Sequence, residues 1–212
     1  MVNLTLYKAI VFDLDNTIYD EIEYLKLAYH WISYKIVLSD NTKLQNEIYD
    51  FLVDEFMKNG RKNLYQKLKN SKKIDDFNEF TLENFLNGLR TCPVNSNQIE
   101  IDPDIYRFIK YLHNNNKSIF ILTNGNVEQQ VNKVKSLNIP FKETIAISYA
   151  SSKGIKYQKP NPYFLDKIIS ENSFINNEIL YIGDSPIDNE TAKNIGVDFL
   201  YVSDFKSQYS EN

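Results

Sequence analysis

Two aspartates near the start of the chain, Asp13 and Asp15 in the motif DLDNT, have the residue type and spacing to act on a phosphate ester. A carboxylate can attack a phosphoryl group and form an aspartyl-phosphate. A second carboxylate can protonate an alkoxide leaving group and later deprotonate water. Because side chains alternate along a strand, the spacing predicts that both carboxylates lie on the same side. D-x-D alone occurs on many protein surfaces, so this interpretation needs support from other motifs.

The motif LTNG offers groups that could bind a phosphate oxygen. These are the hydroxyl of Thr123 and the backbone N–H groups that follow it, beginning at Asn124. Backbone N–H groups near a helix N-terminus bind anions, although the same residues could form only a helix cap and a turn.

Lys159 lies in the segment QKPNPYF, where prolines restrict the backbone on its C-terminal side. A buried ammonium there could neutralise charge on a phosphoryl group in the transition state. Most lysines are simply solvated, so this motif alone is weaker than the others.

The motif GDSPIDN carries Asp184 and Asp188 around a Ser-Pro turn, directly after an apolar segment. With Asp13 nearby in the fold, these acids supply the oxygen ligands that Mg²⁺ prefers. A turn and helix start would use the same residue types. The motif is nevertheless specific, because Gly183, Ser185 and Asn189 accompany both acids.

The motifs follow short apolar segments that are typical of buried strands. Strands alternate with helical patterns at residues 103–116 and 127–138, so we predict an α/β fold with a Rossmann-like parallel sheet flanked by helices. The carboxyl ends of the strands then share one edge. The predicted strands run from Lys8 to Leu14, up to Thr123, from Thr144 to Ser148, up to Asp184, and from Val197, the last one at the sheet edge.

The segment from about residue 18 to residue 92 interrupts this alternation with helical patterns only. Apolar residues recur at helical spacing over residues 22–36 and 44–56, and further helical patterns cover 63–70 and 77–89. We predict an all-α cap subdomain at residues 18–96, inserted into a catalytic core of residues 1–17 and 97–212. The polar segment 91–102 would be the return linker.

Taken in order, DLDNT, LTNG, Lys159-Pro160 and GDSPIDN resemble the four motifs of the haloacid dehalogenase (HAD) superfamily, over Lys8 to Val202. The resemblance implies that Asp13 is the nucleophile and Asp15 the general acid and base. It also implies that Thr123, Asn124 and Lys159 bind the phosphoryl group.

The resemblance further implies that Mg²⁺ is bound by Asp13, the backbone carbonyl of Asp15 and Asp184. Asp188 would support the metal shell and Lys159, together with Gly183 and Ser185. The residues that begin the cap could contact the substrate, although core packing or solvation is an alternative for each. These residues are Tyr19, Glu23 and Tyr24.

The second aspartate favours phosphate chemistry over dehalogenation, because a halide leaves without a proton. We therefore predict a phosphoric monoester hydrolase acting on a small phosphorylated metabolite, such as a nucleoside monophosphate, a sugar phosphate or a phosphoglycolate-like acid. The alternatives are a phosphomutase of the same superfamily and a non-catalytic regulatory protein.

Composition excludes several other classes of protein. The net charge of −4 with scattered Lys and Arg disfavours nucleic acid as a partner. No apolar segment is long enough for a membrane helix, and the single Cys92 fits a reducing compartment. We find no signal sequence at the N-terminus and therefore expect a cytoplasmic protein. We expect it to be a monomer or a homodimer.

Overall fold

Five short apolar segments form one parallel sheet in the computed structural model, which describes residues 4–37, 41–71 and 79–209. The strand order β3-β2-β1-β4-β5 places β1 in the centre and β5 at one edge. Every neighbouring pair is parallel, so the predicted parallel sheet and its last edge strand are confirmed. The strands are β1 (Ala9–Phe12), β2 (Ser118–Thr123), β3 (Ala146–Tyr149), β4 (Ile179–Gly183) and β5 (Asp198–Tyr201).

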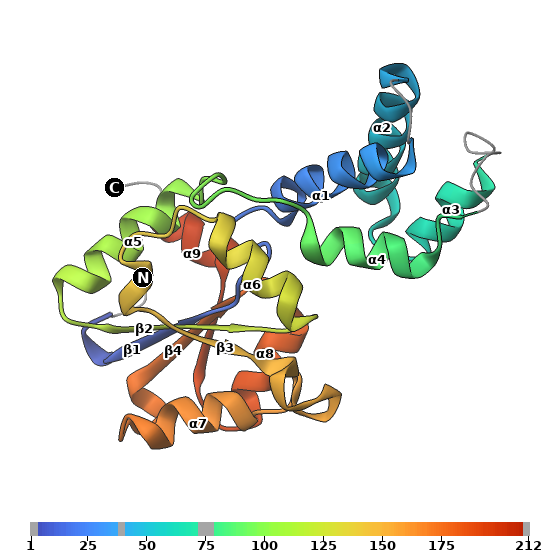
Figure 1. The fold of residues 1–212 in the computed structure, drawn as a ribbon. Coiled ribbons are helices and arrows are strands. Elements are labelled where there is room, and N and C mark those ends of the chain that lie inside the picture. The colour runs from blue at the N-terminus through green and yellow to red at the C-terminus, as the bar shows by residue number, and fades with distance from the viewer. Residues whose placement is uncertain (1–3, 38–40, 72–78, 210–212) are drawn as a thin grey trace.

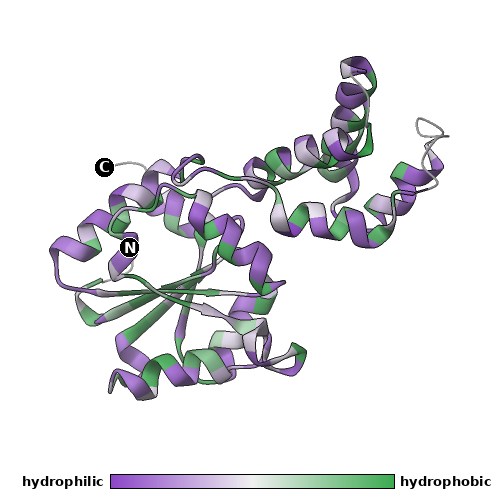
Figure 2. Cartoon of the chain, viewed as in Figure 1, coloured by the Kyte–Doolittle hydropathy of each residue, from purple (hydrophilic) through white to green (hydrophobic). Residues whose placement is uncertain are grey.

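Helices cover both faces of the sheet, which explains why its central strands are apolar throughout (Figures 1 and 2). Ala9 and Val11 of β1 pack with α7 and α8, whereas Ile10 and Phe12 pack with α5, α6 and α9. The strand is therefore buried on both sides. These helices are α5 (Pro103–Asn114), α6 (Val127–Ser136), α7 (Tyr163–Glu171), α8 (Pro186–Lys193) and α9 (Val202–Tyr209).

Four helices between β1 and α5 form a separate helical lobe beyond the sheet (Figure 1). Helix α1 packs against α2 and α4, and α4 also packs against α6 of the sheet domain. The predicted helical insertion is present, while its limits at residues 18 and 96 stay a prediction. The lobe consists of α1 (Glu21–Ile36), α2 (Thr42–Asn59), α3 (Leu64–Asn70) and α4 (Leu82–Thr91).

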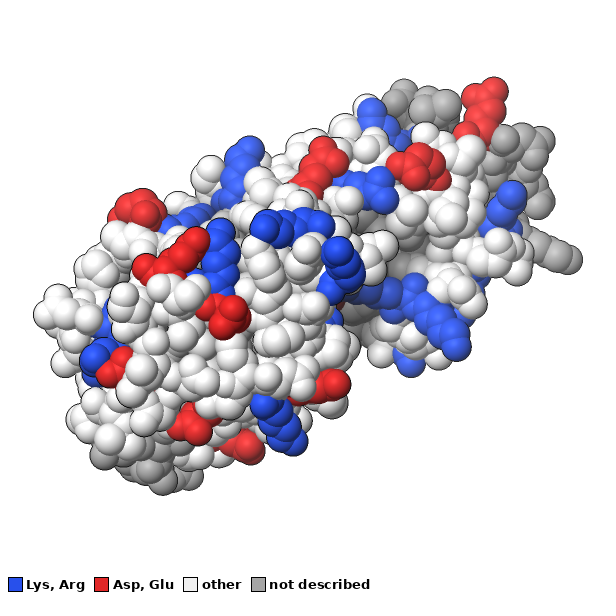
Figure 3. All heavy atoms as spheres, turned by 90° about the horizontal axis from the view of Figure 1, so that it is seen from below, with Lys and Arg blue, Asp and Glu red and all other residues white. Residues whose placement is uncertain are grey.

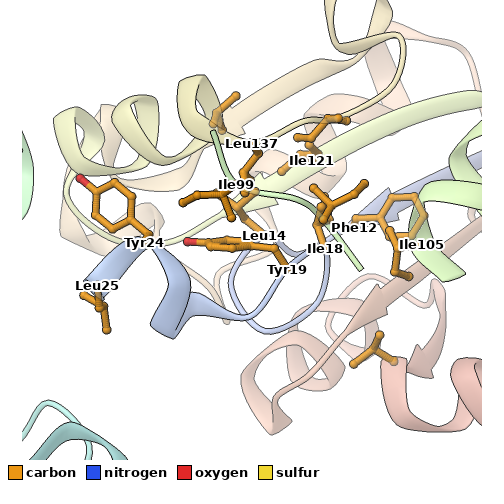
Figure 4. Packing of buried hydrophobic residues seen from close by; sticks show 14 of the residues in the cluster. Phe12, Leu14, Ile18, Tyr19, Tyr24, Leu25, Ile99, Ile105, Ile121 and Leu137 are labelled. Carbon is orange, nitrogen blue, oxygen red and sulfur yellow. The ribbon is translucent and has the colours of Figure 1, made fainter. Parts of the chain in front are cut away.

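The lobe and the sheet domain share one continuous apolar cluster. Leu14, Ile18 and Tyr19 fill the space between β1 and the start of α1, next to Ile99 (Figure 4). Ile99 belongs to the segment predicted as the return linker, and its side chain is buried. The C-terminal part of this linker is thus anchored in the core through Ile99. Its last residue, Asp102, caps α5 by accepting hydrogen bonds from Asp104 and Ile105.

One predicted helix starts later than its sequence pattern. The pattern began at residue 77, but α4 begins at Leu82, because Thr81 and Asn84 form a capping box there. Phe77 and Asn78 lie outside the described residues.

The remaining elements are 3₁₀ helices that connect the larger ones: η1 (Leu4–Leu6), η2 (Lys142–Thr144), η3 (Ala150–Lys153), η4 (Ile155–Tyr157) and η5 (Asn176–Glu178). Across the described ranges, none of the helices combines the length and apolar character needed to cross a membrane.

Candidate active site

The carboxyl ends of β1, β2 and β4 bring together residues that are far apart in the sequence. The backbone N–H of Asp13 donates to the carbonyl of Ile182 at 2.9 Å, which continues the pairing of β1 with β4 past Phe12. Thr123 is the last residue of β2, and Asp184 directly follows β4. The predicted shared edge of the sheet is therefore the location of three of the four motifs.

Lys159 brings the remaining motif, the third in chain order, to this edge. Its ammonium forms an ion pair with Asp13 and another with Oδ1 of Asp188 at 2.6 Å, and it donates to the carbonyl of Leu122 at 3.2 Å. The Lys159 side chain is buried, as are both of the carboxylates it contacts. We call Asp13, Asp184, Asp188 and Lys159 the Lys159 cluster.

The Lys159 cluster carries more negative than positive charge. Carboxylate oxygens of Asp13, Asp184 and Asp188 lie within 4.8 Å of one another. Lys159 pairs with two of them, and Asp184 has no ion pair among the described residues. Three carboxylates and one ammonium leave two negative charges in excess when all are ionised.

The pKa of Asp13 reflects this environment. Burial raises it to about 7, with Lys159 opposing the rise and Asp188 adding to it. Burial would also raise the pKa of Asp188, but the adjacent Lys159 outweighs that effect and holds it below its usual value. Burial and nearby Asp188 raise the pKa of Asp184. Of the two carboxylates that contact Lys159, Asp13 thus ionises less readily than Asp188 when no further cation is bound.

Hydrogen bonds fix Asp188 and Lys159 in place. Asp188 accepts from the hydroxyl of Tyr181 at 2.8 Å and from the hydroxyl of Ser185 at 2.6 Å. Ser185 also caps α8, which presents Asp188 in the first turn of the helix. Asp188 is therefore held in contact with Lys159, while its predicted role in supporting the metal shell stays a prediction.

Asn124 joins the second motif to the third. Its amide donates to the carbonyl of Lys159 at 3.1 Å, and its side-chain oxygen accepts from the backbone N–H of Lys159 at 2.8 Å. The buried hydroxyl of Thr123 donates to the carbonyl of Asn124 at 3.2 Å. Hydrogen bonds thus connect the three residues predicted to bind phosphate, and the Asn124 side chain positions the Lys159 backbone.

Asp15 lies in a different set of contacts from Asp13. Both of its oxygens accept from the ammonium of Lys133, at 2.8 and 2.7 Å. Tyr19 and Gln130 donate to the same carboxylate, at 2.8 and 3.2 Å. The strand ends at Phe12, so the two-residue period on which we based a common direction does not extend to Asp15. The two aspartates are held by different lysines.

Glu21 and Arg61 extend the contacts of Asp15 into the helical lobe. Lys133 donates to Glu21 at 2.5 Å, and Arg61 forms an ion pair with Glu21. Asp15, Glu21, Lys133 and Arg61, which we call the Lys133 cluster, contain two acids and two bases. Burial would raise the pKa of Asp15, but Lys133 outweighs it and lowers the pKa. Burial in turn lowers the pKa of Lys133 to about 8.

The residues predicted as substrate contacts occupy different environments. Tyr19 is buried and touches Asp15. Tyr24 is also buried, and its hydroxyl donates to the carbonyl of Leu89 and accepts from Asn132, so it joins the lobe to α6. Glu23 is exposed and pairs with Lys26 at 2.7 Å.

Sequence reasoning missed Lys133, Gln130 and Glu21. The only signal in the sequence is that Gln130 and Lys133 are three residues apart in one helical pattern, and therefore share a face. A lysine on that pattern is normally solvated.

A cavity of about 650 Å³ lies in the helical lobe at its contact with α6. Most of its wall is apolar, and Arg61 of the Lys133 cluster and Gln129 of α6 add polar groups. In the space-filling view, Lys and Arg side chains gather beside the hollow between the lobe and the sheet domain (Figure 3). The wall includes Leu25, Tyr29, Arg61, Phe85, Leu86 and Gln129.

The family model of haloacid dehalogenase-like hydrolases matches residues 10–202, which include every element of the site. The chain belongs to this family. The match confirms the resemblance that the four motifs indicated. Among curated proteins, none matches the chain in sequence.

Solved structures of HAD proteins share the fold. One from Bacillus subtilis, described as the candidate HAD-hydrolase YfnB bound to magnesium, has a TM-score of 0.60 and 17% identity over 92% of this chain and 86% of that one. A candidate β-phosphoglucomutase from Thermotoga maritima has a TM-score of 0.59 and 14% identity over 90% and 82%. A predicted phosphoglycolate phosphatase from Haemophilus somnus has a TM-score of 0.55 and 16% identity over 93% and 85%. At these identities the likeness concerns the fold alone.

Gly183 lies where a side chain would collide with Asp188. A Cβ atom at this position would lie 2.7 Å from both Cβ and Cγ of Asp188, which is too close for a side chain held by Tyr181 and Ser185. We expect Gly183→Ala to displace Asp188 and Lys159, and to lower kcat about 10-fold or more. Steady-state assays of phosphate release measure this effect.

Gly196→Ala is the matched control for Gly183→Ala. Gly196 precedes β5 and so lies at the amino ends of the strands, away from the site. Its φ of +74° would strain an alanine without affecting the site. This variant should lose stability while keeping its kcat. Unchanged kcat in Gly183→Ala would contradict the steric argument.

Proposed function

We propose that the protein is a Mg²⁺-dependent phosphatase that hydrolyses a small phosphorylated metabolite through an aspartyl-phosphate on Asp13. The observation that carries this proposal is the unequal charge of the two clusters. The Lys133 cluster around Asp15 is balanced, whereas the Lys159 cluster around Asp13 has two negative charges in excess. Only the latter calls for a divalent cation.

The residues present fit Mg²⁺, which prefers carboxylate and carbonyl oxygens. Asp13, the backbone carbonyl of Asp15 and Asp184 would hold it, and both oxygens of Asp188 already accept hydrogen bonds from protein groups. When bound, the cation neutralises charge on the phosphoryl oxygens.

The protein groups account for the two chemical steps. A carboxylate oxygen of Asp13 attacks phosphorus, the ester P–O bond breaks, and Asp15, which enters this step in its protonated form, donates its proton to the leaving oxygen. Asp15 then takes a proton from water, whose oxygen attacks phosphorus and breaks the bond to Asp13. Lys159, Thr123 and the N–H groups after Thr123 bind the phosphoryl oxygens during both steps.

The cavity of the helical lobe supports a small organic leaving group. Its volume falls in the range of small-molecule sites. Arg61 belongs both to its wall and to the Lys133 cluster, so the cavity adjoins the contacts of Asp15. We infer that the lobe acts as the cap and that its cavity selects the substrate.

The proposal is tested with p-nitrophenyl phosphate. Purified protein should release p-nitrophenol when Mg²⁺ is present. In EDTA the rate of release should fall at least about 100-fold, and it should recover when Mg²⁺ is restored. Equal rates in EDTA and in Mg²⁺ would contradict the metal assignment. No release in either condition would contradict the phosphatase proposal.

A phosphomutase is the second candidate, since a structural neighbour is described as one. A panel of sugar phosphates, nucleoside monophosphates and phosphoglycolate separates the two activities. Release of inorganic phosphate supports hydrolysis, whereas isomerisation without release supports a mutase. Saturable binding of a protein partner without any turnover would instead support a regulatory protein.

A further inference from the structure

Lys133 is completely buried, at 0% exposure, although it carries a charge. Burying an ammonium costs free energy unless acceptors compensate for the lost water. Its acceptors are both oxygens of Asp15, at 2.8 and 2.7 Å, and one oxygen of Glu21 at 2.5 Å. An ammonium has three protons to donate, so these contacts account for all of them.

The contacts of Lys133 define the orientation of the Asp15 carboxylate. Oδ1 accepts from Lys133 and Tyr19, and Oδ2 accepts from Lys133 and Gln130. Because Lys133 contacts both oxygens, rotation of the carboxyl group would break at least one of its bonds. The bond from Gln130 is the longest of the four, at 3.2 Å.

The position of Lys133 is itself fixed from two sides. Helix α6 carries it on the face toward the core, where the neighbouring Val134 is buried. Glu21 holds its ammonium from the first turn of α1, and Arg61 pairs with Glu21 on the lobe side. The orientation of Asp15 is therefore tied to both the sheet domain and the helical lobe.

We propose that Lys133 is a positioning residue for the reaction, which aims the Asp15 carboxyl group at the leaving oxygen of the substrate. Lys133 transfers no proton itself. The inference rests on the proposed function, because it concerns the proton that Asp15 delivers when the ester bond breaks. Helix α6 contains none of the four motifs, so the inference gives this helix a part in catalysis that the motifs do not indicate.

Two esters of similar shape separate this role from a general structural one. The p-nitrophenolate ion leaves readily without a proton, whereas the more basic phenolate ion needs one. The parameter kcat/KM reports the steps up to the first bond cleavage, so it isolates the proton delivered to the leaving group. For Lys133→Met, kcat/KM should fall about 100-fold for phenyl phosphate and less than about 10-fold for p-nitrophenyl phosphate.

Two further variants serve as controls. Lys142→Met removes a lysine that binds the carbonyls of Val134 and Leu137 at the end of the same helix without touching Asp15. It should affect both esters equally. Lys133→Met combined with Glu21→Gln restores the charge balance of the cluster, and should recover thermal stability but not the selective defect on phenyl phosphate.

The outcomes distinguish this inference from the function on which it rests. Equal losses on both esters in Lys133→Met, or recovery of both rates in the double variant, would overturn the positioning role and leave the phosphatase intact. A wild-type protein that hydrolyses neither ester would overturn the proposed function and this inference together.

Discussion

Asp13→Asn should abolish turnover, lowering kcat for p-nitrophenyl phosphate at least about 10⁴-fold, because an amide cannot form the aspartyl-phosphate. The substitution keeps the size of the side chain and an oxygen that can accept from Lys159. It also removes a buried carboxylate whose pKa is raised to about 7, so the folded state should not be destabilised. Released p-nitrophenol and the melting temperature measure the two effects.

Mg²⁺ gives a second measurement that does not depend on turnover. A ligand that binds only the folded state raises its stability. Mg²⁺ should therefore raise the melting temperature of the wild-type protein, and raise that of Asp13→Asn less, since one carboxylate ligand is gone.

Asp198→Asn is the control for Asp13→Asn. Asp198 is the first residue of β5 and lies at the amino ends of the strands, away from the site. It accepts a hydrogen bond from the hydroxyl of Tyr7 at 2.9 Å, which an asparagine oxygen can also do. It should keep wild-type activity. Turnover of Asp13→Asn at the wild-type rate would remove Asp13 as the nucleophile.

Lys159→Met should impair both catalysis and stability. Loss of the ammonium removes a charge that stabilises the transferring phosphoryl group, at a cost of about 10²- to 10³-fold in kcat. It also leaves Asp13 and Asp188 buried without their cation, which should lower the free energy of unfolding by about 3 kcal/mol in EDTA at neutral pH. Denaturant titration measures the change.

The stability defect of Lys159→Met should depend on pH. In the wild-type protein, burial raises the pKa of Asp13 to about 7 even though Lys159 lowers it. Removing the Lys159 ammonium should therefore raise this pKa further. From about pH 4 upward, the folded variant then retains a proton that the unfolded chain has released. Stability therefore falls as pH rises through this range, and the difference from wild type should be larger at pH 8 than at pH 5.

Lys167→Met provides the comparison for Lys159→Met. Lys167 forms an exposed pair with Glu171 at 3.5 Å, and such surface changes alter stability by less than about 0.5 kcal/mol. A pH-independent loss in Lys159→Met, equal to that of this control, would contradict the electrostatic account of the Lys159 cluster.

The motifs and the strands were predictable from the sequence because their signals are local. Each strand is a short apolar segment. Three of them, β1, β2 and β4, are followed directly by the polar residues of a motif, which parallel pairing then collects at one edge. The helical insertion was also predictable, because apolar residues recur at helical spacing along α1 and α2. The start of α4 was wrong, since the capping box at Thr81 competes with a continuous helical pattern.

The sequence by itself thus determined the sheet, the helical insertion and the set of residues, starting from Asp13, that we expect to carry the chemistry. Only the tertiary structure decided which lysine each aspartate contacts. In the sequence Lys159 is distinguished by the prolines beside it, but nothing there pairs it with Asp13. The end of β1 at Phe12 and the buried position of Lys133 on α6 assign Lys159 to Asp13 and Lys133 to Asp15. Such pairings join residues more than 100 positions apart, and they depend on packing that no local pattern encodes.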